Sequence, residues 1–208
     1  MRRIPLKPVN TIYYIVDSNF FANKYLRPGE SSNDTDKKRI ENSLSWCEII
    51  NRQISKNSAI VYINELCTSE TFKIMARKYY QDNLFGSNRY QAIRKQIASD
   101  IQLSVSEILS KARSIKYHNI AVDRDVIIGA SRYLEIAYKN ECRSLSVTDL
   151  SILSCAKYLI DFYKINKEQI FILSGDKKLR KCSVKANDGT IVIDSLEPKN
   201  NFKKYFIN

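Results

Sequence analysis

The feature that most constrains this 208-residue chain is the alternation of short apolar runs with amphipathic segments. Strand-like apolar runs cover residues 11–16, 59–63, 119–122, 170–173 and 190–193, with a shorter one at 145–147. Helical spacing of apolar residues marks segments 19–26, 40–54, 64–80, 126–138 and 148–163, the last most clearly. Strands that alternate with helices predict an α/β fold with a mostly parallel central sheet between two helical layers, a three-layer α/β/α sandwich.

The length fits one domain covering residues 1–208. Residues 81–117 add further helical pattern between two predicted strands, so we expect a helical insertion there. Residues 27–38 are rich in Pro, Gly, Ser, Asn and Asp, which predicts a loop. No apolar stretch is long enough to cross a membrane, so we expect no membrane association.

An acidic residue follows each of four apolar runs, and these residues are Asp17, Glu65, Asp149 and Asp176. The carboxyl ends of parallel strands share one edge of a sheet, where ligands bind. Carboxylates gathered there repel one another unless a cation lies between them. Since hard oxygen ligands suit Mg²⁺ or Mn²⁺, the pattern predicts a metal site. Glu48 and Glu70 also lie near helix surfaces, but they rank lower because neither follows a strand so closely.

Each of these acids also has a purely structural explanation. Asp17 and Asn19 could cap the helix that follows them, and Glu65 suits the positive end of a helix dipole. Asp149 completes a Ser-x-x-Asp capping box. Asp176 could be a salt-bridged turn residue. The metal-site hypothesis therefore depends on the four residues taken together.

The charge of the chain is strongly positive. Lys and Arg number 34 against 22 Asp and Glu, giving a net charge of +12, and the isoelectric point is about 9.4. This surplus favours an anionic partner, with nucleic acid ahead of a membrane surface. The alternative is a basic surface that serves only solubility.

Basic and aromatic residues that could contact nucleic acid fall in two places. The basic ones after the fourth acid and in the insertion are Lys177, Lys178, Arg180, Lys181, Arg94 and Lys95. The interleaved aromatics are Tyr79, Tyr80, Phe85 and Tyr90. Aromatic rings can stack on unpaired bases, but we expect most of these four to pack in the protein interior instead.

The five cysteines do not form a recognisable disulfide or zinc pattern. Their number is odd and none of them makes a CxxC pair. We interpret them as buried free thiols in a reducing compartment, and so expect a cytoplasmic protein.

Four motifs in this order resemble those of the PIN-domain nucleases: IVDSN, YINEL, SVTDLSILSCA and FILSGDKKL. The resemblance covers residues 11–65 and 119–194 and leaves 81–117 as an addition. It implies an endoribonuclease that uses Mg²⁺ or Mn²⁺ to hydrolyse RNA to 5′-phosphate and 3′-hydroxyl products. The resemblance assigns the metal and the catalysis to Asp17, Glu65, Asp149 and Asp176, with Asn19 and Ser174 as polar supports.

The resemblance also implies protein partners, and at one position this chain differs from the PIN pattern. Small PIN toxins are restrained by an antitoxin protein and commonly form homodimers, so both are hypotheses for this chain. Many PIN members carry a second acid two residues after the fourth, where this chain has Lys178. That departure favours an alternative, a catalytically inactive PIN-like module that binds RNA or a protein.

Two further nuclease classes are less favoured. Some PIN branches cleave structured DNA. Arg113 and His118 have the R-x4-H spacing of the metal-independent HEPN ribonucleases, but the predicted strands contradict that all-helical fold. A Rossmann-type cofactor enzyme is disfavoured because the chain, with five glycines, has no GxGxxG loop.

Overall fold

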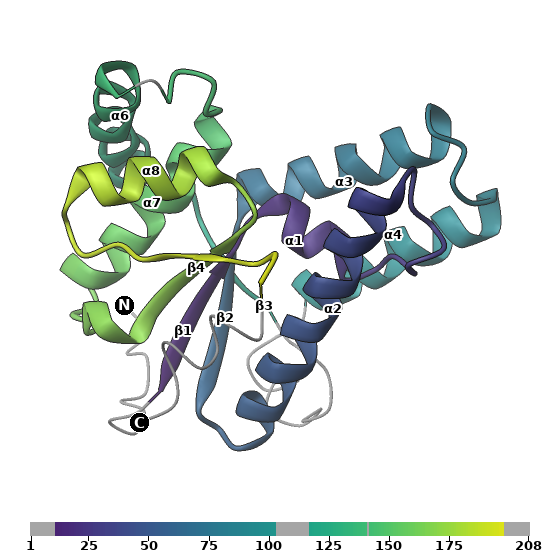
Figure 1. Cartoon of the computed structure of the whole chain (residues 1–208). Coiled ribbons are helices and arrows are strands. Elements are labelled where there is room, and N and C mark those ends of the chain that lie inside the picture. The colour runs from purple at the N-terminus through teal and green to yellow at the C-terminus, as the bar shows by residue number, and fades with distance from the viewer. Residues whose placement is uncertain (1–10, 103–116, 141, 198–208) are drawn as a thin grey trace.

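The computed structural model describes residues 11–102, 117–140 and 142–197, and its centre is a parallel β-sheet (Figure 1). The strands are β1 (Ile12–Val16), β2 (Ala59–Asn64), β3 (Tyr117–Ile120), β4 (Ile170–Ser174) and β5 (Val192–Asp194). In the described residues they form one sheet in the order β3-β2-β1-β4-β5, and every pairing is parallel. The prediction of a parallel α/β sheet is confirmed.

Helices cover both faces of the sheet. They are α1 (Ser18–Asn23), α2 (Asp34–Ser55), α3 (Glu65–Tyr80), α4 (Ser87–Gln102), α6 (Arg124–Lys139), α7 (Val147–Asp161) and α8 (Lys177–Ala186), with the short 3-10 helix η1 (Lys167–Gln169). Figure 1 shows α6, α7 and α8 on one side of the sheet and α1 to α4 on the other. Helix α7 contacts β1, β2 and β4, whereas α2 and α3 contact β2. The molecule is therefore a three-layer α/β/α sandwich.

Burial explains why these apolar runs form strands. Every residue of β2 and β4 is buried, as expected for central strands of a parallel sheet that is covered on both faces. Helix α7 buries an unbroken run from Leu150 to Ala156 between the sheet and the neighbouring helices, mainly α6. Each large apolar side chain removed from water there contributes about 1.5–3 kcal/mol. The sheet and α7 thus form the centre of the core.

The structure corrects three predictions about local elements. Residues 145–147 are not a strand, because Ser146 is the N-cap of α7 and forms a capping box with Asp149, which outweighs the two apolar residues Leu145 and Val147. The predicted loop 27–38 ends early, since Asn33 caps α2 and Asp34 begins it. The N-cap of α1 is Asp17, one residue before its first residue Ser18, and not Asn19.

Helices α8 and α4 are the two other elements to compare with the expectation. Helix α8 was not predicted, because the cations after Asp176 suggested a charged turn. Within the expected insertion 81–117, residues 87–102 form α4, which packs on α3, and residues 103–116 lie outside the described residues.

The cysteines agree with the prediction, since all five are free and buried. Among the described helices, none has both the length and the apolar character of a membrane span.

Candidate functional site

A cleft with a volume of about 690 Å³ lies at the edge of the sheet where β1 and β4 end. Helices α1, α2, α3, α7 and α8 and the segment after β5 line it. Its charged lining residues are Asp17, Asp36, Asp149, Asp176, Asp194 and Glu197 and the cations Lys38, Arg39, Arg77, Lys78 and Lys177. The volume is within the range of ordinary ligand sites, and the lining combines carboxylates with cations.

Asp17 is the most buried acid of the cleft, with 4% of its surface exposed. It caps α1, and its Oδ1 accepts a hydrogen bond of 2.6 Å from the backbone N–H of Phe20. Burial raises the pKa of Asp17 to about 6, although hydrogen bonds from Ser174 and Phe20 oppose the rise. The negative charges of Asp149 and Asp176 raise it further. These three carboxylates are therefore close enough to influence one another.

Ser174 connects two of these acids. It is the last residue of β4 and is fully buried. Its hydroxyl donates to the carboxylate of Asp17, and its Oγ accepts from the backbone N–H of Asp176 at 3.0 Å. Ser174 thus occupies the supporting position expected from the sequence. Asn19, the other expected support, is exposed on α1 and lines the cleft.

Asp149 and Asp176 are each fixed at the start of a helix. In the capping box of α7, Oδ2 of Asp149 accepts from the backbone N–H of Ser146 at 2.8 Å and from its hydroxyl at 2.7 Å. Oδ1 of Asp176 accepts from the N–H groups of Lys178 and Leu179 at 2.6 and 3.3 Å. Within the described residues, the second oxygen of each carboxylate accepts no hydrogen bond, so the capping role leaves it available to a ligand.

The environment of Asp149 links it to a fourth acid. Burial raises the pKa of Asp149, its hydrogen bonds with Ser146 oppose this, and the charges of Asp176 and Glu70 add to the rise. Glu70 lies on α3 and accepts a hydrogen bond of 2.6 Å from the hydroxyl of Ser18. The acids that act on one another are thus Asp17, Glu70, Asp149 and Asp176, which we call the acidic cluster.

Glu65, the fourth acid expected from the sequence, lies elsewhere. It is exposed in the first turn of α3, where Oε1 accepts from Asn119 Nδ2 at 3.3 Å and Oε2 from the N–H of Val122 at 3.4 Å. These contacts direct it to the end of β3, and neither Glu65 nor Glu70 is among the residues that line the cleft. The charge of Glu70 acts on Asp149, so the structure favours Glu70 over Glu65 as the acid that α3 contributes to the cluster.

The chemistry of the acidic cluster fits a hard divalent cation. Its donors are carboxylate oxygens, the type that Mg²⁺ and Mn²⁺ prefer. Asp17 is buried beside two other acids, a charge arrangement that a bound cation would relieve. In residues 11–102, 117–140 and 142–197, however, no three His, Cys, Asp or Glu side chains lie close enough together to hold a metal ion. A cation bound there would complete its coordination with waters or a substrate phosphate, or by movement of the carboxylates.

The cations around the cleft differ in their availability. Lys38, Arg39, Arg77 and Lys177 are exposed on its walls. Lys78 instead forms a buried ion pair of 2.8 Å with Asp36, which joins α3 to α2. The four exposed cations are the ones placed to meet an anionic ligand.

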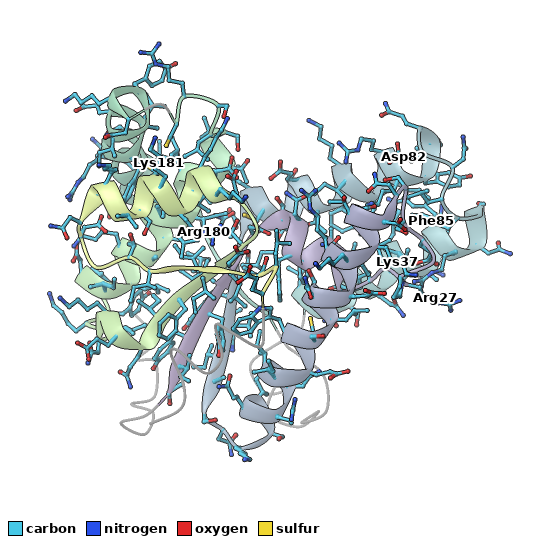
Figure 2. The ribbon with its side chains drawn as sticks, in the orientation of Figure 1. Arg27, Lys37, Asp82, Phe85, Arg180 and Lys181 are labelled. Atoms are coloured by element: carbon cyan, nitrogen blue, oxygen red, sulfur yellow. The ribbon has the colours of Figure 1, made fainter. Side chains whose placement is uncertain are left out.

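Of the six basic residues expected to contact nucleic acid, the structure places only Lys177 in the cleft lining. The ammonium group of Lys178 donates to the hydroxyl of Ser144. Arg180, on α8 in Figure 2, forms an ion pair of 2.6 Å with Asp194. The other three lie on the surfaces of α8 and α4: Lys181, Arg94 and Lys95.

No protein-family model matches this chain, and no curated protein matches it. The residues of the site themselves are therefore the basis for assigning a function.

Proposed function

We propose that this protein is a PIN-like, metal-dependent endoribonuclease that hydrolyses RNA phosphodiester bonds with Mg²⁺ or Mn²⁺ held by the acidic cluster. The observation that carries the proposal is the convergence of Asp17, Asp149 and Asp176 in one cleft, from the ends of β1 and β4 and the start of α7. Like charges brought together cost stability, and such arrangements concentrate at functional sites. The net charge of +12 fits a polyanionic substrate.

The proposed reaction gives different roles to the carboxylates and to the cations of the cleft. A divalent cation, when bound, supplies Lewis acidity that activates water and stabilises charge at phosphorus. Asp17, Asp149 and Asp176 are mounted on helix starts, and their capping hydrogen bonds fix the orientation of the carboxylates. The exposed cations Lys177 and Arg77 would bind the phosphates on either side of the bond to be cleaved.

The rival function is a PIN-like module that binds RNA or a protein without turnover. Two observations favour it. The described ranges contain no group of three metal-ligating side chains, and three of the acids already have a structural role, Asp17 and Asp176 as helix N-caps and Asp149 in a capping box. Lys178, which stands where many PIN members have a second acid, also favours this module, and its ammonium group contacts Ser144.

Among the other classes, a structure-specific DNA nuclease remains a lesser alternative that a DNA substrate would test. The parallel sheet is incompatible with the all-helical fold of the HEPN ribonucleases. His118 would be the catalytic residue of a HEPN ribonuclease. It belongs to β3, where the centroid of its ring lies 5.4 Å from that of Tyr62. Arg113 lies outside the described residues.

The resemblance to PIN toxins also suggests a restraining antitoxin and a homodimer. A reducing compartment such as the cytoplasm fits the five buried thiols. These remain parts of the proposal.

The test is cleavage of single-stranded RNA in the presence of Mn²⁺, with an equivalent DNA strand in parallel. Wild type should cut RNA and stop when EDTA is added. Asp149→Asn should lose roughly 100-fold or more of this activity, since several kcal/mol of metal assistance is removed. Glu65→Gln, an exposed acid outside the cleft lining, is the control. RNA that binds but stays intact with wild-type protein and Mn²⁺ would support the binding module instead.

A further inference from the structure

The hairpin formed by α3 and α4 contains a group of aromatic rings close to the cleft. Tyr79 stacks on Tyr90, with ring centroids 4.6 Å apart and an interplanar angle of 10°, and on Phe85 at 6.4 Å and 14°. Tyr90 is buried, while Tyr79 and Phe85, the latter labelled in Figure 2, are half-buried against the core. These three rings hold the hairpin together, as the sequence predicts for most of its aromatics.

Tyr80 is the exception in this group. Its exposed fraction is 70%, the largest of any aromatic residue that the structure describes. It meets Tyr79 at 4.5 Å and 64°, and Tyr90 at 5.8 Å and 74°, so both contacts are edge-on. The two neighbours therefore hold the ring in place without covering it with a parallel ring. An exposed, supported ring of this kind can stack on an unpaired base.

The position of Tyr80 relates it to the cleft. It is three residues after Arg77 on α3, so the two side chains are neighbours on the helix surface. Arg77 is exposed in the cleft lining, and Glu70 of the acidic cluster lies on the same helix. At about 1.5 Å per residue, Arg77 and Tyr80 lie about 10 and 15 Å along α3 from Glu70. Helix α3 thus runs from the acidic cluster past the exposed cation Arg77 to the exposed ring of Tyr80.

The charge around Tyr80 suits a nucleic acid more than an apolar partner. Lys73 and Arg77 are exposed on the same helix, and the guanidinium of Arg94 lies 5.7 Å from the centroid of the Tyr90 ring. Positive charge combined with an aromatic surface is typical of sites that bind single strands.

We propose that Tyr80 stacks on an unpaired base of the RNA while Arg77 binds a phosphate between that base and the acidic cluster. This inference rests on the proposed ribonuclease function and assigns it a substrate-binding subsite that extends from Arg77 in the cleft lining to Tyr80 beyond it. Bases in a duplex are already stacked on both faces and cannot use such a ring, so the subsite selects a single-stranded segment.

Binding and cleavage are measured separately to test this. Fluorescence anisotropy measures the affinity of the Asp17→Asn protein for a labelled single-stranded RNA of about 12 nucleotides and for the matching duplex. The Asp17→Asn protein is used because it should not cut either RNA. Added to that background, Tyr80→Ala should weaken single-strand binding about tenfold, while Tyr80→Phe keeps the ring and the affinity. Tyr138→Ala removes a tyrosine that is 56% exposed on α6 and should change nothing. Arg77→Ala should weaken both RNAs and lower the salt dependence by about one phosphate contact.

Each outcome decides the proposal. Unchanged single-strand binding by Tyr80→Ala would overturn it and indicate that the ring serves another partner, such as a protein. An equal loss of duplex binding, or a Phe variant as weak as the Ala variant, would also overturn it. If wild type cleaves RNA and Tyr80→Ala leaves RNA binding unchanged, the subsite is wrong but the ribonuclease function is still supported. Failure of wild type to bind or cut any RNA would remove both.

Discussion

The hydroxyl of Ser174 donates a hydrogen bond to the buried carboxylate of Asp17, which joins the ends of the neighbouring strands β4 and β1. The same oxygen accepts the backbone N–H of Asp176. One small side chain therefore fixes two acids of the cluster relative to each other. This connection makes the geometry of the site sensitive to a residue that would not itself need to touch the metal.

Replacing Ser174 with alanine should lower RNA cleavage about 10- to 100-fold, the usual effect of losing a residue that orients a metal ligand. Stability should fall by about 1–3 kcal/mol, because buried hydrogen-bonding groups lose their partner. Cleavage assays and urea unfolding measure the two effects. Ser195→Ala is the control, since Ser195 is also buried and lines the cleft beyond β5. Equal activity losses in both variants would contradict the orienting role.

The buried charge of Asp17 should make the metal-free protein more stable in mild acid. The pKa of Asp17 in the folded state is about 6, above its ordinary value of 3.8. The folded protein therefore binds the proton more tightly than the unfolded chain. The stabilisation from protonation is complete below 3.8 and is lost as the pH rises through 6.

It follows that Asp17→Asn should stabilise the metal-free protein at pH 7, by at most about 3 kcal/mol, with the gain disappearing toward pH 4. Asparagine is a good N-cap, so α1 should be retained. Urea unfolding in EDTA across this pH range is the measurement, and the exposed Asp82→Asn (labelled in Figure 2) is the control. A variant that is less stable than wild type at pH 7 would show that the charge of Asp17 is not a cost to the fold.

Glu70 and Glu65 provide a matched pair on one helix. Glu70→Gln should lower Mn²⁺-dependent cleavage about tenfold or more, because it removes a charge that acts on Asp149. Glu65→Gln should have little effect, since its contacts are with Asn119 and Val122 at the end of β3. Initial rates at saturating Mn²⁺ compare them. The reverse order of effects would restore Glu65 as the acid of the site.

The fold and three of the four acids could be predicted because their signals are local. Asp17 and Asp176 come directly after apolar strands or their turns, and Asp149 completes a capping box that a short sequence motif reveals. Glu70 carries no such signal. Its position depends on which face of α3 packs against α1, a contact in which Thr71 donates to the carbonyl of Ser18. The rule that site residues directly follow strands pointed to Glu65 instead.

The roles of the basic residues were harder to predict for a similar reason. Lys38 and Arg39 belong to the first turns of α2, but the loop-like composition before them hid the start of that helix. Arg180 follows an acidic residue in a basic run and suggested phosphate binding, yet its partner Asp194 comes from the neighbouring β5. Pairing between distant segments is a tertiary property that charge patterns along the chain do not specify.

The ion pair between Lys78 and Asp36 should be important for the cleft wall. The side chains of both are largely buried, with 6% and 18% exposed. Lys78→Met leaves an unpaired carboxylate and should cost about 3 kcal/mol, whereas the double variant with Asp36→Asn should recover most of that loss. Denaturant unfolding measures the difference. A single variant as stable as wild type would show that the pair contributes little.

The central claim is tested most directly by measuring Mn²⁺ binding to the intact protein. Isothermal titration calorimetry and thermal melting both detect that binding. We expect wild type to bind Mn²⁺ and to melt at a higher temperature in its presence, because the ion binds only the folded state. Asp149→Asn and Asp176→Asn should lose most of that binding, while Glu65→Gln keeps it. A wild-type protein that binds no Mn²⁺, or cluster variants that bind it as tightly as wild type, would contradict a metal site in this cleft.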